Sequence, residues 1–135
     1  MKTYWDSSAL VFALHHAEIL NGIRKSEHFT RIHAVAEMFS TLTKGVLYRY
    51  PAEDASRMIE QLGANLTFVE LSQTDAVAAT KLAKKLGVRG ARIHDLFHAM
   101  AAKKSAADVL MTLDTAGFSG FAFGYQIEEP AINGS

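Results

Sequence analysis

Short apolar segments of strand length alternate with longer segments of helical periodicity along the whole chain, and this alternation limits the fold more than any other feature. Segments with strand composition lie at 2–5, 30–33, 66–71, 109–113 and 121–127. Helices are expected at 9–14, 34–44, 51–62, 72–86 and 93–104, with a further helix and loop within 15–30. Strands that alternate with helices favour a three-layer α/β/α sandwich around a mainly parallel central sheet.

Two of the expected helices carry clear local signals. Four apolar residues recur at helical spacing in the segment 34–44: Val35, Met38, Phe39 and Leu42. This stripe predicts that Phe39 faces the core. Ser72 with Asp75 is typical of a helix N-terminal cap, and Gly87 is placed to end that helix.

Length and composition indicate one domain of residues 1–135, because there is no internal repeat and no linker. The absence of cysteine excludes disulfides and thiolate metal sites. No window approaches the run of about 18 apolar residues that a membrane helix needs. The N-terminal residues do not form an export signal, so we expect a cytoplasmic protein that does not contact a membrane. Net charge is zero, from 14 basic and 14 acidic residues, which gives no support for tight non-specific binding of nucleic acid.

Four acidic residues fall where functional groups collect in such a fold, beyond the carboxyl ends of strands or at the start of helices. Asp6 ends the first strand, and Asp114 follows the apolar run 109–113. Glu37 lies early in the helix 34–44, and Asp95 lies at the start of the helix 93–104. The fold can therefore bring all four carboxylates to one edge of the sheet.

Crowded carboxylates need a positive charge to offset their mutual repulsion. Oxygen ligands suit Mg²⁺ or Mn²⁺, which lower the pKa of a bound water and stabilise charge on a phosphate during in-line attack. In this hypothesis Asp6 and Asp95 bind the metal directly. Glu37 and Asp114 complete the pocket, either directly or through water, and help to orient the attacking water.

Several neighbouring residues would support this site. Ser8 and Thr112 are hydrogen-bond donors that would hold the carboxylates in place. His94 is expected beside the acidic pocket. With His98 it is similar to the His-Glu-x-x-His zinc motif, but aspartate replaces the glutamate and no third ligand is evident. Three basic residues are candidates for binding an RNA backbone: Arg92, Lys44 and Arg49.

Each acid also has a purely structural interpretation. Asp6 could cap the following helix, and Asp95 could bind free helix-terminal amides. Asp114 before Gly117 is typical of a turn, and Glu37 shares a helix face with polar residues. The functional interpretation therefore depends on the set of four.

Together with their surroundings, the four acids resemble the motifs of the PIN-domain family. The matching segments are Tyr4–Leu10, His33–Phe39, Ile93–Ala102 and Ala107–Asp114, the last followed shortly by Phe118. The resemblance extends from Tyr4 to about Pro130 and is weakest over residues 43–90.

The resemblance implies a PIN-like endoribonuclease that depends on Mg²⁺ or Mn²⁺ and uses Asp6, Glu37, Asp95 and Asp114. Bacterial members of this size are commonly toxins of the VapC type that are held inactive by a small antitoxin. They commonly form homodimers, for which helices within 9–25 and 53–62 are candidate contact surfaces.

There are three alternatives, of which the first is also a nuclease. The chain could be a PIN-like nuclease of RNA processing or DNA repair that has no antitoxin. It could be a non-catalytic module that binds RNA or protein and keeps the acids for folding. A phosphate-transfer receiver domain is disfavoured, because no acidic pair lies near Asp6.

Overall fold

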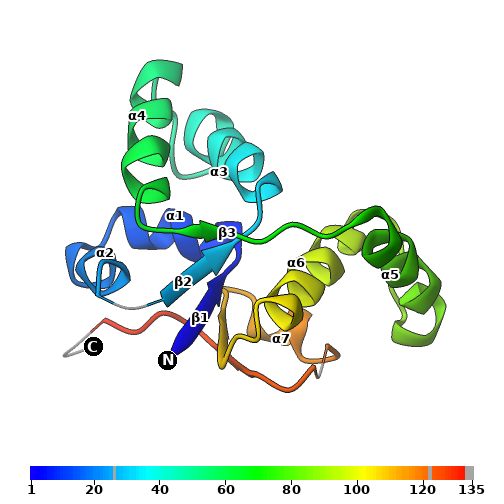
Figure 1. Ribbon diagram of the computed structural model, residues 1–135. Helices are drawn as coiled ribbons and strands as arrows, with labels where there is room; N and C mark the ends of the chain where they lie inside the picture. The colour runs from blue at the N-terminus through cyan, green and yellow to red at the C-terminus, as the bar shows by residue number, and fades with distance from the viewer. Residues whose placement is uncertain (26, 122, 133–135) are drawn as a thin grey trace.

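A single five-stranded sheet forms the centre of the molecule (Figure 1). The structure, a computed structural model, describes residues 1–25, 27–121 and 123–132. The strands are β1 (Lys2–Trp5), β2 (Glu27–Thr30), β3 (Thr67–Phe68), β4 (Val109–Met111) and β5 (Gln126–Glu128). They lie in the order β3-β2-β1-β4-β5, and every pairing is parallel. The carboxyl ends of all five strands therefore meet at one edge of the sheet.

Helices cover both faces of this sheet, which confirms the predicted three-layer fold. One face packs against α1 (Ser7–Leu14), α2 (Ala17–Ile23), α3 (His33–Lys44) and α4 (Ala52–Gly63) (Figure 1). The other packs against α5 (Gln73–Leu86), α6 (Ile93–Lys104) and α7 (Thr115–Phe118), with the short 3₁₀ helix η1 (Gly90–Arg92) before α6. A hydrophobic core lies on each side of the sheet, and neighbouring residues of the central strand β1 pack into different cores. Trp5 packs against the first set of helices and Tyr4 against the second. Alternate residues of a strand point to opposite faces, so both layers are anchored on β1.

The position of the second strand was predicted wrongly. The structure has β2 at Glu27–Thr30, and Ile32 already has helical backbone angles before α3. The reason is that the buried residues of β2 are polar. His28 accepts a hydrogen bond from the indole of Trp5 at 2.8 Å, and the Thr30 hydroxyl donates to the Trp5 carbonyl at 2.8 Å. A buried strand whose polar groups are satisfied by its neighbour does not appear apolar in the sequence.

Two other strand predictions were too long. β3 contains only Thr67–Phe68 of the expected 66–71. β5 overlaps the expected strand 121–127 only at residues 126–127, and residue 122 lies outside the described residues. Phe121 is fully buried beside Phe118, so its apolar character reflects packing against α7 and not strand pairing.

Helix boundaries were predicted more accurately. α6 has the expected bounds, Ser72 and Asp75 form a reciprocal capping box, and Gly87 ends α5 with a left-handed φ of 69°. Phe39 is an exception, because 39% of it is exposed. The buried stripe of α3 is made by Ala34, Met38 and Leu42. Among the described residues, none of the helices combines the length and apolarity needed to cross a bilayer.

Candidate acidic active site

The pairing of β1 with β4 brings Asp6 and Thr112 together. Trp5 is opposite Met111, and the Asp6 amide continues the ladder by donating to the Met111 carbonyl at 3.1 Å. The Thr112 hydroxyl then donates to Oδ2 of Asp6 at 2.6 Å. Both side chains are buried, with Asp6 only 6% exposed. This contact joins the carboxyl ends of the two strands.

The carboxylate of Asp6 is held by three donors in all. Oδ1 accepts from the Ser8 hydroxyl at 2.7 Å and from the Ala9 amide at 2.9 Å, so Asp6 is also the N-cap of α1. Ser8 Oγ in turn accepts from the Leu113 amide at 3.1 Å. The structural and functional interpretations of Asp6 are therefore compatible. Its capping bond, Ser8 and Thr112 together fix the direction in which the carboxylate points.

Asp114 lies one step further along the same edge. Its amide donates to the Thr112 hydroxyl at 3.0 Å, so Thr112 connects Asp114 with Asp6. Oδ1 of Asp114 accepts from the Gly117 amide at 3.0 Å and caps α7, as turn chemistry predicts. Oδ2 is the oxygen of this exposed carboxylate that remains for a ligand.

Asp95 is the third acid of the group. It lies in the first turn of α6, and burial raises the pKa of its carboxyl above the usual range. The positive charge of His98 opposes this shift, the negative charges of Asp6 and Asp114 add to it, and Arg92 lowers the pKa by the smallest amount. No hydrogen bond joins the Asp95 carboxylate to any other residue in the described part of the chain. It is a half-buried acid whose charge is disfavoured by its neighbours, which is a position that a cation would stabilise.

Glu37 approaches the site from α3 and has a different environment. Its Oε1 is 2.8 Å from Nε2 of His98, whose Nδ1 is 2.7 Å from the hydroxyl of Tyr4. Burial alone would raise the pKa of Glu37. The hydrogen bond from His98 and the nearby His98, His33 and His94 rings outweigh burial and lower that pKa. Glu37 therefore lies on the histidine side of the site, while Asp6, Asp95 and Asp114 form the carboxylate side.

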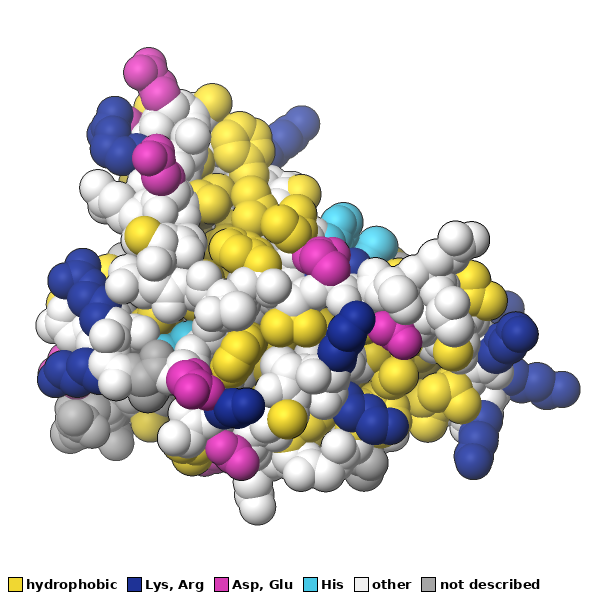
Figure 2. All heavy atoms as spheres, viewed as in Figure 1, with side chains coloured by type: hydrophobic (Ala, Val, Ile, Leu, Met, Phe, Trp, Pro, Cys, Tyr) yellow, Lys and Arg dark blue, Asp and Glu magenta, His cyan; other side chains and the backbone are white. Residues whose placement is uncertain are grey.

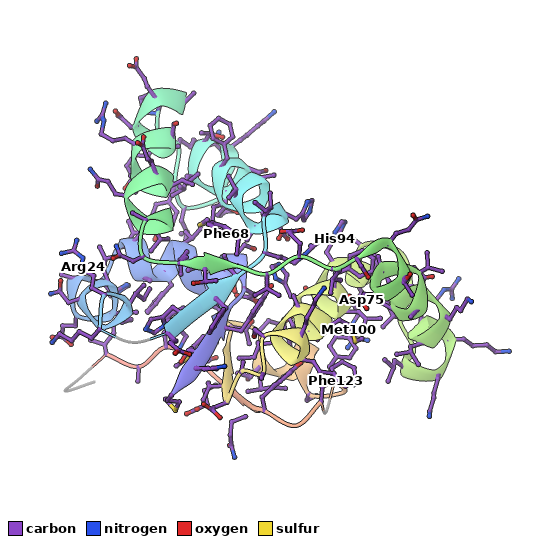
Figure 3. All side chains as sticks on the ribbon, in the orientation of Figure 1. Arg24, Phe68, Asp75, His94, Met100 and Phe123 are labelled. Atoms are coloured by element: carbon purple, nitrogen blue, oxygen red, sulfur yellow. The ribbon has the colours of Figure 1, made fainter. Side chains whose placement is uncertain are left out.

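His94 lies near Glu37, at the outer rim of the site. It projects from the first turn of α6 and stacks on His33 of α3, with ring centroids 5.0 Å apart and planes 10° apart (Figure 3). Histidine side chains are visible on the surface next to acidic atoms (Figure 2). His98, by contrast, is buried and binds Tyr4 and Glu37. The two histidines of the zinc-like motif therefore have separate partners, and the structure gives no support for that reading.

The three candidate RNA-binding residues have different surroundings. Arg92 donates to the Gly117 carbonyl at 2.7 Å, and its guanidinium lies 5.0 Å from the centre of the Phe121 ring. It fastens the start of α6 to α7 and adds positive charge near Asp95. Lys44 and Arg49 are exposed, and no hydrogen bond or ion pair joins them to another residue that the structure describes. Their role toward RNA stays a prediction.

A divalent metal was expected at this edge. No group of three or more acidic or histidine residues among those described is close enough to bind a metal directly. Mg²⁺, however, usually keeps several waters and takes only one or two protein carboxylates. Asp95 has no competing hydrogen bond, and Asp114 keeps one oxygen free. The donor set therefore fits a hydrated ion that is held by one or two of these acids, with the others acting through water.

The fold is similar to that of several solved structures, among them the following three. VapBC2 from Rickettsia felis, solved bound to a DNA fragment from the promoter, has a TM-score of 0.68 and 17% identity over 96% of this chain and 98% of that chain. PAE2754 from Pyrobaculum aerophilum has a TM-score of 0.72 and 20% identity, covering 94% and 89%. VapBC-1 from nontypeable Haemophilus influenzae has a TM-score of 0.66 and 19% identity, covering 96% and 98%. At these identities the likeness shows a shared fold.

A search of curated protein sequences finds no match to this chain. The sequence model of the PIN domain matches residues 4–124, which include all four acids and every helix that positions them. The chain therefore belongs to the PIN-domain family.

Proposed function

We propose that this PIN-domain chain is an endoribonuclease that hydrolyses RNA phosphodiester bonds with the help of Mg²⁺ or Mn²⁺, and that it acts in the cytoplasm. The observation that carries the proposal is the carboxylate group of Asp6, Asp95 and Asp114. Asp6 and Asp114 raise the pKa of Asp95, and the three acids lie where parallel strands end, which is where such folds bind ligands. Family membership supports a nuclease, and oxygen-only donors support a hard cation.

Each acid has a distinct role in this proposal. Asp95 and Asp6 would hold the ion, and Asp114 would act on it through a water. When bound, the ion lowers the pKa of a coordinated water and neutralises charge on the phosphate. Glu37 is ionised at neutral pH because its pKa is lowered, so it can accept a hydrogen bond from the attacking water and orient it.

The exposed apolar surface supports the proposal that this chain binds a partner protein. A groove of about 460 Å³ lies between α1 and the segment after α3, and its lining includes Ser8 and Leu113 from the edge of the site. Val46 and Leu47 beside it are 98% and 80% exposed. Apolar side chains this exposed are typical of protein-binding surfaces. Together with the similarity to VapBC structures, the groove supports the finer proposal that the chain is the toxin of a type II pair and binds a small antitoxin here.

A second apolar area lies over α3 and α4 (Figure 2). It is lined by Ile32, Val35, Phe39 and Ile59, among others, and has a volume of about 450 Å³. This area includes the helix predicted to form a dimer contact, and it supports homodimerisation as part of the same proposal.

The decisive experiment is cleavage of a mixed structured RNA by the purified chain with Mn²⁺, with EDTA, and with Asp6→Asn. Glu53→Gln on exposed α4 is the matched control. We expect cleavage that needs the metal, disappears in Asp6→Asn and persists in Glu53→Gln. Cleavage that Asp6→Asn leaves intact would refute the site.

The same samples separate the alternatives. A non-catalytic binding module predicts no cleavage and no rise in melting temperature with Mn²⁺, whereas an ion at 100 times its dissociation constant adds about 2.7 kcal/mol. A nuclease of RNA processing or DNA repair predicts metal-dependent cleavage with no co-purifying small protein. An antitoxin encoded in a neighbouring reading frame should instead co-purify and suppress cleavage.

A further inference from the structure

We propose that Tyr4 and His98 are positioning residues that hold the Glu37 carboxylate in the acidic site through a buried hydrogen-bond chain. This inference rests on the proposed nuclease function. It adds two residues that do not touch the metal or the RNA but fix the side chain that orients the attacking water.

Both hydrogen bonds of this chain are short. The Tyr4 hydroxyl is 2.7 Å from Nδ1 of His98, and Nε2 of His98 is 2.8 Å from Oε1 of Glu37. Tyr4 and His98 are 0% and 1% exposed, and their rings meet edge to face with centroids 5.8 Å apart. The imidazole therefore has one orientation, set by a partner on each nitrogen.

The residues of the hydrogen-bond chain lie on the same helices and strand that carry the acids. Tyr4 lies on β1 two residues before Asp6, and His98 lies on α6 one turn after Asp95. Glu37 lies on α3. The hydrogen-bond chain thus connects three of the four segments that carry the acids. Its two contacts join residues that are 94 and 61 positions apart in the sequence. A shift of any one of these elements would move Glu37 relative to Asp6 and Asp95.

The direction of each hydrogen bond follows from the partners of His98. An ionised carboxylate only accepts hydrogen bonds, so we assign a proton to Nε2 of His98, which donates to Oε1 of Glu37. Nδ1 is then the acceptor for the Tyr4 hydroxyl, which can donate. Oε2 of Glu37 has no hydrogen-bond partner among the described residues, which leaves that oxygen for water in the site.

A purely structural role does not explain a histidine at this position. The buried face of α6 around it consists of Leu96, Ala99, Ala101 and Ala102. Burying an imidazole there has a desolvation cost that an apolar side chain of similar size avoids. Both of its polar atoms are nevertheless satisfied, and one of them is bonded to a site acid. Fully satisfied buried networks of this kind orient side chains.

Two amide substitutions of His98 test its hydrogen bonds to Glu37 and Tyr4 separately. In His98→Gln the amide can reach the place of Nε2 and donate to Glu37. In His98→Asn the shorter amide occupies the place of Nδ1, keeps a contact with Tyr4 and loses Glu37. We expect His98→Asn to lower kcat by about 10- to 100-fold with little change in KM, as for other residues that hold site ligands. His98→Gln should recover most of that loss. His16→Gln, at the N-cap of α2, is the control and should leave kcat unchanged.

Two further measurements test the positioning role of His98. In a double-mutant cycle, His98→Asn should add nothing to Glu37→Gln, because both remove the same oriented carboxylate. Equal kcat losses in the Gln and Asn variants, or losses that add to that of Glu37→Gln, would overturn the positioning role. A lower melting temperature with unchanged kcat per folded molecule would overturn it too.

The second readout does not need activity. Long-range ¹⁵N–¹H NMR of the metal-free protein should show His98 as a single Nε2–H tautomer, and Tyr4→Phe should change the chemical shift of Nδ1 while the proton stays on Nε2. An Nδ1–H tautomer in the wild type would refute the proposed hydrogen-bond chain. If NMR shows the expected tautomer and the wild type cleaves no RNA, the proposed function fails while the hydrogen-bond chain stands.

Discussion

The hydroxyl of Thr112 donates to Oδ2 of Asp6 at 2.6 Å, and the oxygen of that hydroxyl accepts a hydrogen bond from the Asp114 amide at 3.0 Å. One threonine therefore connects two acids that are far apart in the sequence. It is in position because β1 and β4 are parallel neighbours and continue their ladder to Asp6. The geometry of the site is thus a direct consequence of strand register.

Thr112→Val tests this connection, because it keeps the shape of the side chain and removes the hydroxyl. Asp6 loses a donor, and the Asp114 amide loses its acceptor. We expect a fall in cleavage of about 10- to 100-fold and a loss of about 1.5–3 kcal/mol in the free energy of unfolding. Thr112→Ser, which keeps the hydroxyl, is the control. Denaturant unfolding and cleavage rates measure both effects, and a fully active valine variant would contradict the prediction.

Asp95→Asn should act in opposite directions on stability and metal binding. The raised pKa of Asp95 means that its charged form costs stability above that pKa in the metal-free protein, and the cost disappears as the pH falls through the pKa. In EDTA at neutral pH, the asparagine variant should therefore melt at a higher temperature than the wild type. The difference should shrink as the pH is lowered, and Mn²⁺ should stabilise the variant less. A lower melting temperature in EDTA would show that Asp95 has a structural role.

The sequence predicts the carboxylate side of the site much better than the histidine side. Asp6 and Asp114 could be placed because an apolar strand followed by aspartate defines both the element and the position beyond its end. The sequence draws attention to His98 only through its spacing from His94, which is similar to a zinc motif. Helical periodicity indicates that it lies on the buried face of α6, one turn after Asp95. It does not show that the facing residue is Tyr4, 94 positions earlier. β2 was misplaced for a related reason, since His28 and Thr30 are buried polar residues whose partners belong to another strand.

Glu37→Gln should show the reverse pH dependence of Asp95→Asn. The pKa of Glu37 is lowered from its ordinary value of 4.5, so its charged form stabilises the folded state above that value. This contribution is lost as the pH falls from 4.5 through the lower folded pKa. In EDTA, Glu37→Gln should therefore be less stable than the wild type at neutral pH and approach it in acid. Unfolding curves across this range measure the effect, and a constant difference at all pH values would contradict it.

The exposed groove leads to a prediction about association that is separate from catalysis. Val46 and Leu47 are almost wholly exposed, and none of the four acids is among the residues that line the groove. Val46→Ser with Leu47→Ser should therefore weaken capture of a co-expressed antitoxin by at least about tenfold, since each removes apolar area worth about 1–2 kcal/mol when buried. Cleavage by the free enzyme should stay at the wild-type rate, because neither residue contacts an acid. Val77→Ser on α5, a 46% exposed apolar residue away from the groove, is the matched control. Equal affinity in all three proteins would place the partner elsewhere, and loss of cleavage in the double variant would show that the groove shapes the active site itself.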